Sequence, residues 1–135
     1  MRHDDEYRMN NVAKRGIVIE RDPKKKRVKV RFEDEDEQPS MWVDVLASSA
    51  KTTKTFMMPD EDDEVWCLFD AKGEDGCVVG SKYNEKDAPP HESNDDISIV
   101  GSFGSIHLDK ASGNLTIQLN GNIKVTASRI DFEKG

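Results

Sequence analysis

Two runs of acidic residues are the first candidates for chemistry in this sequence: EDEDE at residues 33–37 and DEDDE at residues 60–64. Closely spaced carboxylates can hold a metal ion or act as an acid–base pair. Neither run has a histidine nearby or a glycine framework, and acidic runs of this kind are usually solvated. We therefore predict turns at both places, with no metal site and no catalytic pair of carboxylates.

Basic and imidazole side chains raise two further possibilities. KKKR at residues 24–27 could contact phosphate groups, but it lies between Asp22 and an apolar strand-like segment, which favours the tip of a hairpin. His107 could form a ring of histidines around a metal ion if several copies of the chain met on a symmetry axis. Its neighbours Ile106 and Leu108 are better candidates for that axis, and the alternation of a strand then directs His107 outward.

The remaining candidates lack a catalytic context. Trp42 and Trp66 lie in strand-like segments, so we expect them in a barrel core or in contacts between barrels, and not as platforms on which bases stack. Cys67 and Cys77 lack metal-binding spacing and are expected to be buried free thiols, with a cross-strand disulfide as the alternative. The sequence has no Ser/His/Asp constellation, P-loop or nucleophile elbow. We predict that the protein is not an enzyme and uses no cofactor.

The composition limits the possible partners. The chain has 135 residues and a net charge of −7, and apolar and charged residues each make up 35% of it. A negative chain is a poor match for nucleic acid, which is bound through basic surfaces. No apolar run is long enough to span a membrane. The start shows no secretion leader, so we expect the chain to stay in the cytosol in which it is made.

The first part of the chain predicts a small antiparallel barrel. Short segments rich in β-branched and aromatic residues alternate with polar turns, at residues 15–22, 27–32, 41–47, 64–69 and 77–83. Five such strands most simply form an OB-type barrel. The core residues that we predict for it are Ile17, Ile19, Val28, Val30, Phe32, Trp42, Val65, Cys67 and Val78.

The charge pattern predicts a second module. Residues 1–90 contain 16 Lys and Arg and 21 Asp and Glu, whereas residues 91–135 contain only 4 and 6. A stretch rich in Pro, Asn, Asp and Glu lies between them and is typical of a linker. The predicted organisation is an N-terminal arm at 1–11, a barrel at 12–84, a linker at 85–96 and a C-terminal module at 97–135.

Within the C-terminal module, NLTIQLNGNIKVTA (114–127) alternates between apolar or glycine residues and polar ones, as a half-buried strand does. Its large apolar side chains are worth about 1.5–3 kcal/mol each if fully buried, but ordering each residue costs about 1–2 kcal/mol. A ribbon of this size cannot fold alone. Since the polar linker argues against packing on the barrel, we expect stripes from several copies to meet on a symmetry axis. The alternation shifts by one residue at Ser128, which predicts a bulge or turn there.

Five segments of the chain carry a family resemblance, and they occur in the family's order: RGIVIERDPKKKRVKVRF, SMWVDVLA, MMPDEDDEVWCLF, GCVVGSKYNEKDAPP and SIHLDKASGNLTI. Together they resemble the baseplate assembly protein V, or central spike protein, of contractile phage tails. The same OB module is found at the base of type VI secretion spike proteins. The resemblance covers nearly the whole chain from about residue 8.

The resemblance implies an all-β homotrimer: three five-stranded OB-type barrels, followed by a short intertwined triple-stranded β-helix. It also implies docking on the tail hub, piercing of the bacterial outer envelope, and a place in the virion tail baseplate after assembly in the host cytoplasm. The residues that we expect at the trimer axis are Ile97, Ile99, Ile106, Leu108, Leu115, Ile117, Leu119, Ile123, Val125, Ile130 and Phe132.

The sequence departs from the family in two ways. Asp62 stands where the family has a glycine before the fourth strand, and because Asp tolerates a left-handed backbone we expect the turn to be kept. The His-x-His apex that holds an iron ion in longer relatives is missing, so we predict no metal at the tip. Ile130 and Phe132 could plug the axis. We favour instead a separate cap protein, as proline-alanine-alanine-arginine repeat proteins cap secretion spikes.

An OB-fold module that binds nucleic acid and carries a C-terminal oligomerisation tail is the alternative function. The net charge of −7 and the ordered alternation of the C-terminal stripe both favour the spike.

Overall fold

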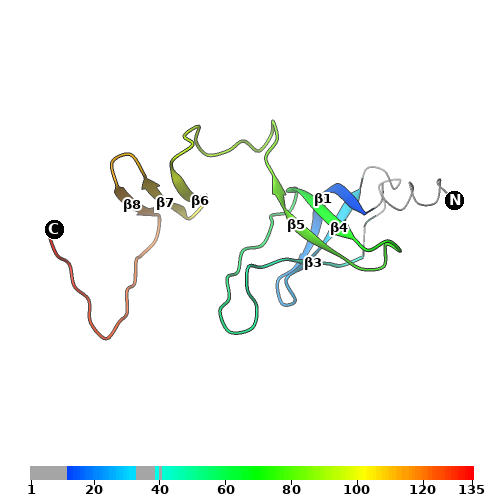
Figure 1. Cartoon of the computed structure of the whole chain (residues 1–135), viewed down its shortest axis with the longest axis horizontal. Coiled ribbons are helices and arrows are strands. Elements are labelled where there is room, and N and C mark those ends of the chain that lie inside the picture. The colour runs from blue at the N-terminus through cyan, green and yellow to red at the C-terminus, as the bar shows by residue number, and fades with distance from the viewer. Residues whose placement is uncertain (1–11, 33–38, 40) are drawn as a thin grey trace. The chain divides into compact units, whose positions relative to one another are not determined.

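The computed structural model describes residues 12–32, 39 and 41–135, so the predicted arm at 1–11 and the acidic run at 33–37 lie outside the described residues. The chain divides into two compact units, one ending at Ala88 and the other spanning Pro89–Gly135. The division falls within the stretch that the sequence predicts as a linker. The described residues form strands and irregular segments, with no helix among them (Figure 1).

The first unit is a closed barrel of five strands in the order β1-β2-β3-β5-β4. Its strands are β1 (Ala13–Asp22), β2 (Arg27–Phe32), β3 (Val43–Val45), β4 (Glu64–Phe69) and β5 (Gly76–Lys82). The long β1 closes the barrel because it pairs with β2 along one edge and with β4 along the other. The predicted five-stranded barrel is confirmed.

One pairing in the barrel differs from the prediction. β3 and β5 run parallel, whereas the sequence predicted a small antiparallel barrel, most simply of the OB type. Parallel neighbours need a long connection between them. Here the connection contains the exposed 46–58 loop and all of β4, which is long enough to bring β5 back beside β3 in the same direction.

The barrel core consists of eight fully buried apolar residues, with Val45, Met58 and Phe69 packed against it. Phe32 is the largest of them and meets Phe69 edge to face, with 5.7 Å between the ring centroids. Of the predicted core residues, the structure buries Val28, Val30, Phe32, Val65, Cys67 and Val78, and it adds Val18 and Val43.

Three predicted core residues, Ile17, Ile19 and Trp42, are only half-buried. On β1 the apolar run leaves the alternation open, and the inward face is set by Gly16 and Val18. A Cβ on Gly16 would lie 2.5 Å from Val30 Cγ1 and 2.8 Å from Phe32 Cδ1, so the missing side chain makes room for these core residues. Strand alternation then turns Ile17 outward, and the β1–β2 register shifts at Ile19.

Trp42 lies on the outside of the barrel because the next residue, Val43, begins β3 and points into the core. The Trp42 ring lies beneath two cations of β2, with the Arg27 guanidinium 5.2 Å and the Lys29 ammonium 5.0 Å from its centroid. These contacts shield the ring without burying it in the core.

The second unit contains a three-stranded antiparallel sheet in the order β6-β7-β8. β6 (Ile97–Gly101), β7 (Gly104–Asp109) and β8 (Asn114–Leu119) follow one another through short turns. Beyond β8, residues 120–135 form no strand within the chain, although the sequence predicts one around Ile123 and Val125. Figure 1 shows this segment extended and turning back once; the chain bends at Ser128, where the predicted alternation shifts.

Candidate functional site

The candidate site is the apolar face of the β6–β8 sheet. Strand register places its residues directly opposite one another in three rows: Ile97–Leu108–Leu115, Ile99–Ile106–Ile117 and Gly101–Gly104–Leu119. Because alternate residues of a strand share a face, these rows form one continuous apolar surface. The structure thus brings together the predicted axis residues from Ile97 to Leu119.

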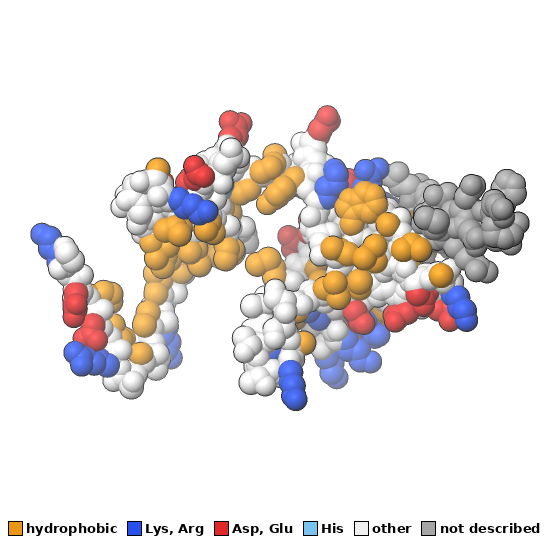
Figure 2. Space-filling model, viewed as in Figure 1, with side chains coloured by type: hydrophobic (Ala, Val, Ile, Leu, Met, Phe, Trp, Pro, Cys, Tyr) orange, Lys and Arg blue, Asp and Glu red, His pale blue; other side chains and the backbone are white. Residues whose placement is uncertain are grey.

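This apolar face is largely open to solvent in the single chain. Leu115 exposes 64% of its surface, Ile97 53%, Ile117 47% and Ile106 39%. Figure 2 shows apolar side chains gathered over these strands on the face in view. A contiguous apolar surface of this kind marks a site of protein association. Each aliphatic side chain contributes about 1.5–3 kcal/mol when it is buried.

The other predicted axis residues lie beyond β8, in a segment without strand pairing. Ile123, Val125 and Ile130 expose 60%, 62% and 47% of their surface, and Phe132 exposes 93%. Within the described chain, β6 and β8 each have a neighbour on one side only. Their outer edges therefore present unpaired backbone N–H and C=O groups, which readily pair with another chain.

Two special turns hold the apolar face in register. Between β6 and β7, Gly104 has φ +128°, and a Cβ there would collide with the backbone of Gln118 and Leu119. Between β7 and β8, the Asp109 carboxylate accepts hydrogen bonds from the backbone N–H of Ala111 (3.0 Å) and Ser112 (3.4 Å). The Ser112 and Ala111 hydrogen bonds lower the pKa of Asp109 below its usual value. Asp109 thus organises the turn in its charged form.

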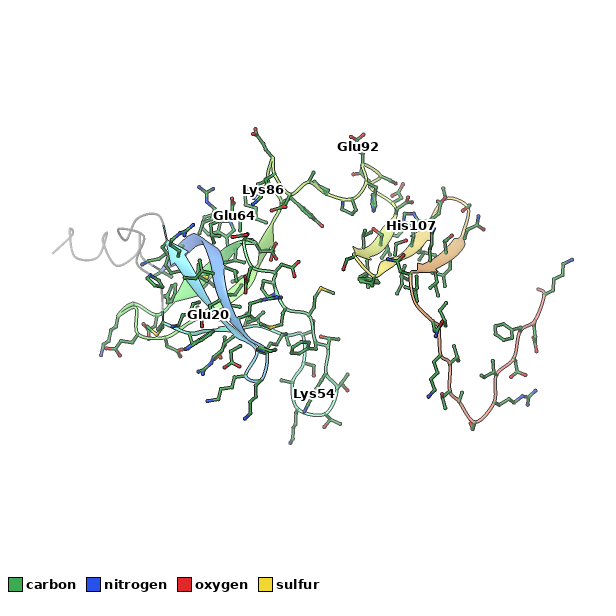
Figure 3. All side chains as sticks on the ribbon, turned by 180° about the vertical axis from the view of Figure 1, so that it is seen from behind. Glu20, Lys54, Glu64, Lys86, Glu92 and His107 are labelled. Atoms are coloured by element: carbon green, nitrogen blue, oxygen red, sulfur yellow. The ribbon has the colours of Figure 1, made fainter. Side chains whose placement is uncertain are left out.

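His107 lies on the polar face of the sheet, opposite Ser98 on one side and Thr116 on the other. Figure 3 shows it on the middle strand. Its Nε2 is 3.1 Å from Asp96 Oδ2, and its ring meets the His91 ring edge to face at 5.7 Å. The alternation of β7 predicts the outward direction of His107. It does not predict these two partners, because Asp96 and His91 lie before β6 and outside the strand of His107.

The second acidic run forms a turn, as predicted, and it also makes ion pairs that were not predicted. Asp60 N–H donates to Asp63 Oδ2 (2.8 Å), and Asp62 adopts φ +73°. Glu64 lies 3.3 Å from Lys82 Nζ and 3.8 Å from Arg15 Nε. Burial opposes ionisation of Glu64, but the hydrogen bonds from Lys82 and Asn84 and the two cations outweigh it and lower its pKa. No group of three potential metal-ligating residues occurs in the part of the chain that the structure describes.

The remaining candidates have structural surroundings. KKKR forms the tip of the β1–β2 hairpin, where Arg27 Nε donates to Asp22 Oδ2 at 3.0 Å. Trp66 is 43% exposed on the outside of β4. Cys67 and Cys77 are free thiols, one buried and one half-buried, and burial raises the pKa of Cys67 to about 12. A thiol with that pKa is protonated at neutral pH and is a poor nucleophile.

A comparison with family models identifies the family to which the chain belongs. The family model described as the type VI secretion system/phage-baseplate injector OB domain matches residues 14–89, which is more than half of the chain. The chain belongs to this family. No match is found among curated proteins. The resemblance drawn from the sequence motifs is thereby confirmed for the barrel.

Membership of the injector OB domain family gives the protein a structural role in a baseplate, in association with other tail baseplate components. The matched residues are those of the barrel and the start of the linker. The apolar face of β6–β8 lies outside the match, so its role is inferred from the structure. No helix in the described residues is long and apolar enough to cross a membrane.

Proposed function

We propose that the protein is the central spike of a contractile tail baseplate. Three copies associate through the C-terminal unit to form an intertwined triple-stranded β-helix, with the predicted axis residues turned toward the three-fold axis. The barrels form the base that docks on the tail hub. The spike pierces the bacterial outer envelope when the tail contracts, and it carries no catalytic function.

One observation carries this proposal: the C-terminal unit has a well-formed sheet but no core. The barrel buries eight apolar side chains almost completely, whereas the apolar residues of β6–β8 and of the following segment stay exposed. A three-stranded sheet needs a covered apolar face to be stable. Identical faces from neighbouring copies supply that cover symmetrically, and the unpaired edges of β6 and β8 give each copy a place to bind an extended segment of another.

The proposal is tested by placing charges on the two faces of β8. Ile117→Asp would bring three carboxylates together near the axis. Desolvating these like charges should destabilise each trimer by roughly several kcal/mol. Gln118→Asp, the matched control, places the same charge on the opposite face of the same strand. Light scattering after size-exclusion chromatography should give about 46 kDa, three times 15.2 kDa, for the parent chain and the control. Ile117→Asp should give the mass of one chain. A trimeric Ile117→Asp variant would refute the axis assignment.

The exposed residues near the end of the spike bear on the tip. Ile130 and Phe132 present apolar surface that an envelope-piercing tip cannot leave in water. In our proposal a separate cap protein covers them. A density map of the assembled particle should then show additional density of the size of a small domain beyond the spike. A spike with solvent directly beyond its last residues would contradict the cap.

A second candidate function, binding of nucleic acid, is favoured by the basic β1–β2 hairpin and by Trp42. The Trp42 ring is already covered by Arg27 and Lys29, which leaves less of it available for stacking on a base. We therefore expect no binding of a single-stranded oligonucleotide at physiological salt in fluorescence anisotropy. Micromolar binding would favour the second candidate.

A further inference from the structure

The barrel has a hollow that the spike function does not use. It has a volume of about 330 Å³ and lies between the end of β3, the 46–58 loop and β5, with Lys26, Leu46, Thr55, Met57 and Val79 among its lining residues. Leu46, Met57 and Val79 expose 54%, 69% and 54% of their surface, so their apolar side chains are accessible. Lys26, Ser48 and Thr55 add polar groups to the lining. Its volume is within the range of sites that bind small ligands or single side chains of a partner.

Lys26 contributes an ammonium group to the lining of the hollow. Lys26 Nζ donates to the Leu46 carbonyl oxygen at 3.2 Å and lies 6.0 Å from the Phe56 ring centroid. The Lys26 backbone has φ +51°, a left-handed conformation that is unfavourable for a residue with a side chain. The hairpin tip thus holds this lysine in an unfavourable conformation, from which its side chain reaches the 46–58 loop.

The surroundings of the hollow are basic, although the chain as a whole is acidic. Residues 23–26 and 45–59, which include Lys26 and the loop that lines the hollow, contain no Asp or Glu and five lysines, at positions 24, 25, 26, 51 and 54. The nearby cations Arg27, Lys29 and Lys82 are instead paired with acidic side chains. Figure 3 shows Lys54 on the loop that borders the hollow. A local basic surface on a chain of net charge −7 attracts an anionic partner and repels a second copy's basic surface.

The hollow also adjoins an open strand edge. β5 pairs with β4 as far as Lys82, but on its other side it pairs with β3 only at Cys77 and Val78. The last contact there is the hydrogen bond from Leu46 N–H to the Val78 carbonyl, after which the chain leaves into the 46–58 loop. In the described residues, the β5 edge from Val79 onward therefore has no neighbouring strand and can accept one from another protein.

We propose that this groove binds an extended acidic segment of another baseplate protein. The segment adds as a strand to the free edge of β5, an apolar side chain enters the hollow between Leu46, Met57 and Val79, and a carboxylate pairs with Lys26. That the partner is a baseplate component rests on the structural role of the family in a baseplate. The groove itself lies in the barrel unit and not in the sheet that forms the proposed trimer.

A protein segment fits the groove better than nucleic acid does. A strand edge offers backbone hydrogen bonds at the spacing of an extended peptide, and the apolar side chains in the hollow suit an aliphatic side chain. Nucleic acid would instead stack on a series of exposed aromatic rings beside the cations. Phe56, 63% exposed beside Lys26, offers one such ring. The Trp42 ring, which lies near the same hairpin, is covered by Arg27 and Lys29.

The test uses the full chain and a fluorescent peptide of alternating glutamate and valine. We expect saturable binding in fluorescence anisotropy. Binding should weaken at least about tenfold when alternate backbone nitrogens of the peptide are methylated, because this removes the hydrogen-bond donors to β5. Met57→Glu should weaken binding to a similar degree, since it places a carboxylate in the hollow. Leu68→Glu is the matched control: Leu68 is exposed on β4 and does not line the hollow, so binding should be unchanged.

Three results would overturn the proposal: equal binding of a peptide of alternating lysine and valine, equal binding of the methylated peptide, or no binding of the acidic peptide. Displacement of the peptide by a single-stranded oligonucleotide that binds more tightly would also overturn it in favour of nucleic acid. Light scattering on Met57→Glu separates this test from that of the trimer. The variant should keep the mass of three chains even where it loses the peptide.

Discussion

The barrel and the C-terminal sheet are built from similar strands, but only the barrel buries its apolar side chains within the chain. In the barrel, β1 pairs along both edges and closes the sheet on itself, so that Val18, Val65 and their neighbours are fully buried. In the C-terminal unit the sheet has the same alternation, yet Leu115 and Ile117 remain about half exposed. The difference shows that alternation predicts a two-faced strand but does not say which molecule covers the apolar face.

The largest effect is expected in the barrel core. Phe32→Ala removes a fully buried ring that meets Phe69 edge to face, and we expect the free energy of unfolding of the barrel to fall by about 3–5 kcal/mol. Urea denaturation followed by tryptophan fluorescence measures this loss. Under native conditions the variant should keep the parent mass, because in our proposal the C-terminal unit forms the trimer. A variant that loses the trimer while its barrel stays stable would contradict the proposal that the C-terminal unit holds the copies together.

The next effect separates two glycines of the C-terminal sheet. Gly104→Ala adds a Cβ that collides with the Gln118 carbonyl, whereas Gly113→Ala adds one in open space; both glycines have positive φ. We expect Gly113→Ala to cost about 1 kcal/mol for its backbone conformation alone. Gly104→Ala should cost clearly more and lower the melting temperature of the assembly further. Equal melting of the two variants would show that the tight β6–β7 turn is not needed for the apolar face.

Acidification should weaken the β7–β8 turn. Because the folded pKa of Asp109 is below the ordinary value of 3.8 for an aspartate, the charged carboxylate stabilises the turn above the unfolded pKa. This contribution is lost as the pH falls through the lower, folded pKa. The melting temperature of the C-terminal unit should therefore fall as the pH is lowered below about 4. Asp109→Asn should melt lower at neutral pH and lose less on acidification; an equal loss in both proteins would contradict this role.

The smallest effect is expected when Asp62 is replaced by glycine. Asp62 adopts φ +73° in the turn before β4 and donates its N–H to the Val18 carbonyl at 2.8 Å. Asp62→Gly relieves the left-handed backbone but frees the unfolded chain, so the net change should stay within about 0.5 kcal/mol. Asp62→Val should cost about 1–2 kcal/mol, because a β-branched side chain is poorly accommodated there. Equal stability of the two variants in urea would show that this turn does not depend on its backbone conformation.

The sequence predicted the strands well because turn residues punctuate both units. The predicted ranges agree with β1, β2, β4 and β5 to within about two residues. The phase of β1 could not be predicted, since residues 17–19 are all apolar and only the close approach of Val30 and Phe32 to Gly16 selects the inward face. The parallel β3–β5 pair was missed for a similar reason, because strand order depends on contacts distant in the sequence.

The candidate site was more predictable than the groove. Strict alternation places the apolar residues of β6–β8 on one face, and the register of the sheet follows from the two short turns. The groove on the barrel joins Lys26, Leu46 and Val79 from three separate segments. Nothing in their local patterns links them, so only the fold brings them together.

Hydrogen exchange of the full chain tests most directly whether neighbouring copies complete the C-terminal unit. In a single chain, residues 120–135 have no strand partner and expose their apolar side chains, so their amides should exchange at unprotected rates. If three copies intertwine, amides around Ile123 and Val125 should be protected to a degree comparable with β7, and Ile117→Asp should remove that protection. Full, rapid exchange from Gly121 onward in the parent protein, with the barrel still protected, would contradict the spike; the Asn120 N–H donates to the Phe103 carbonyl within the chain.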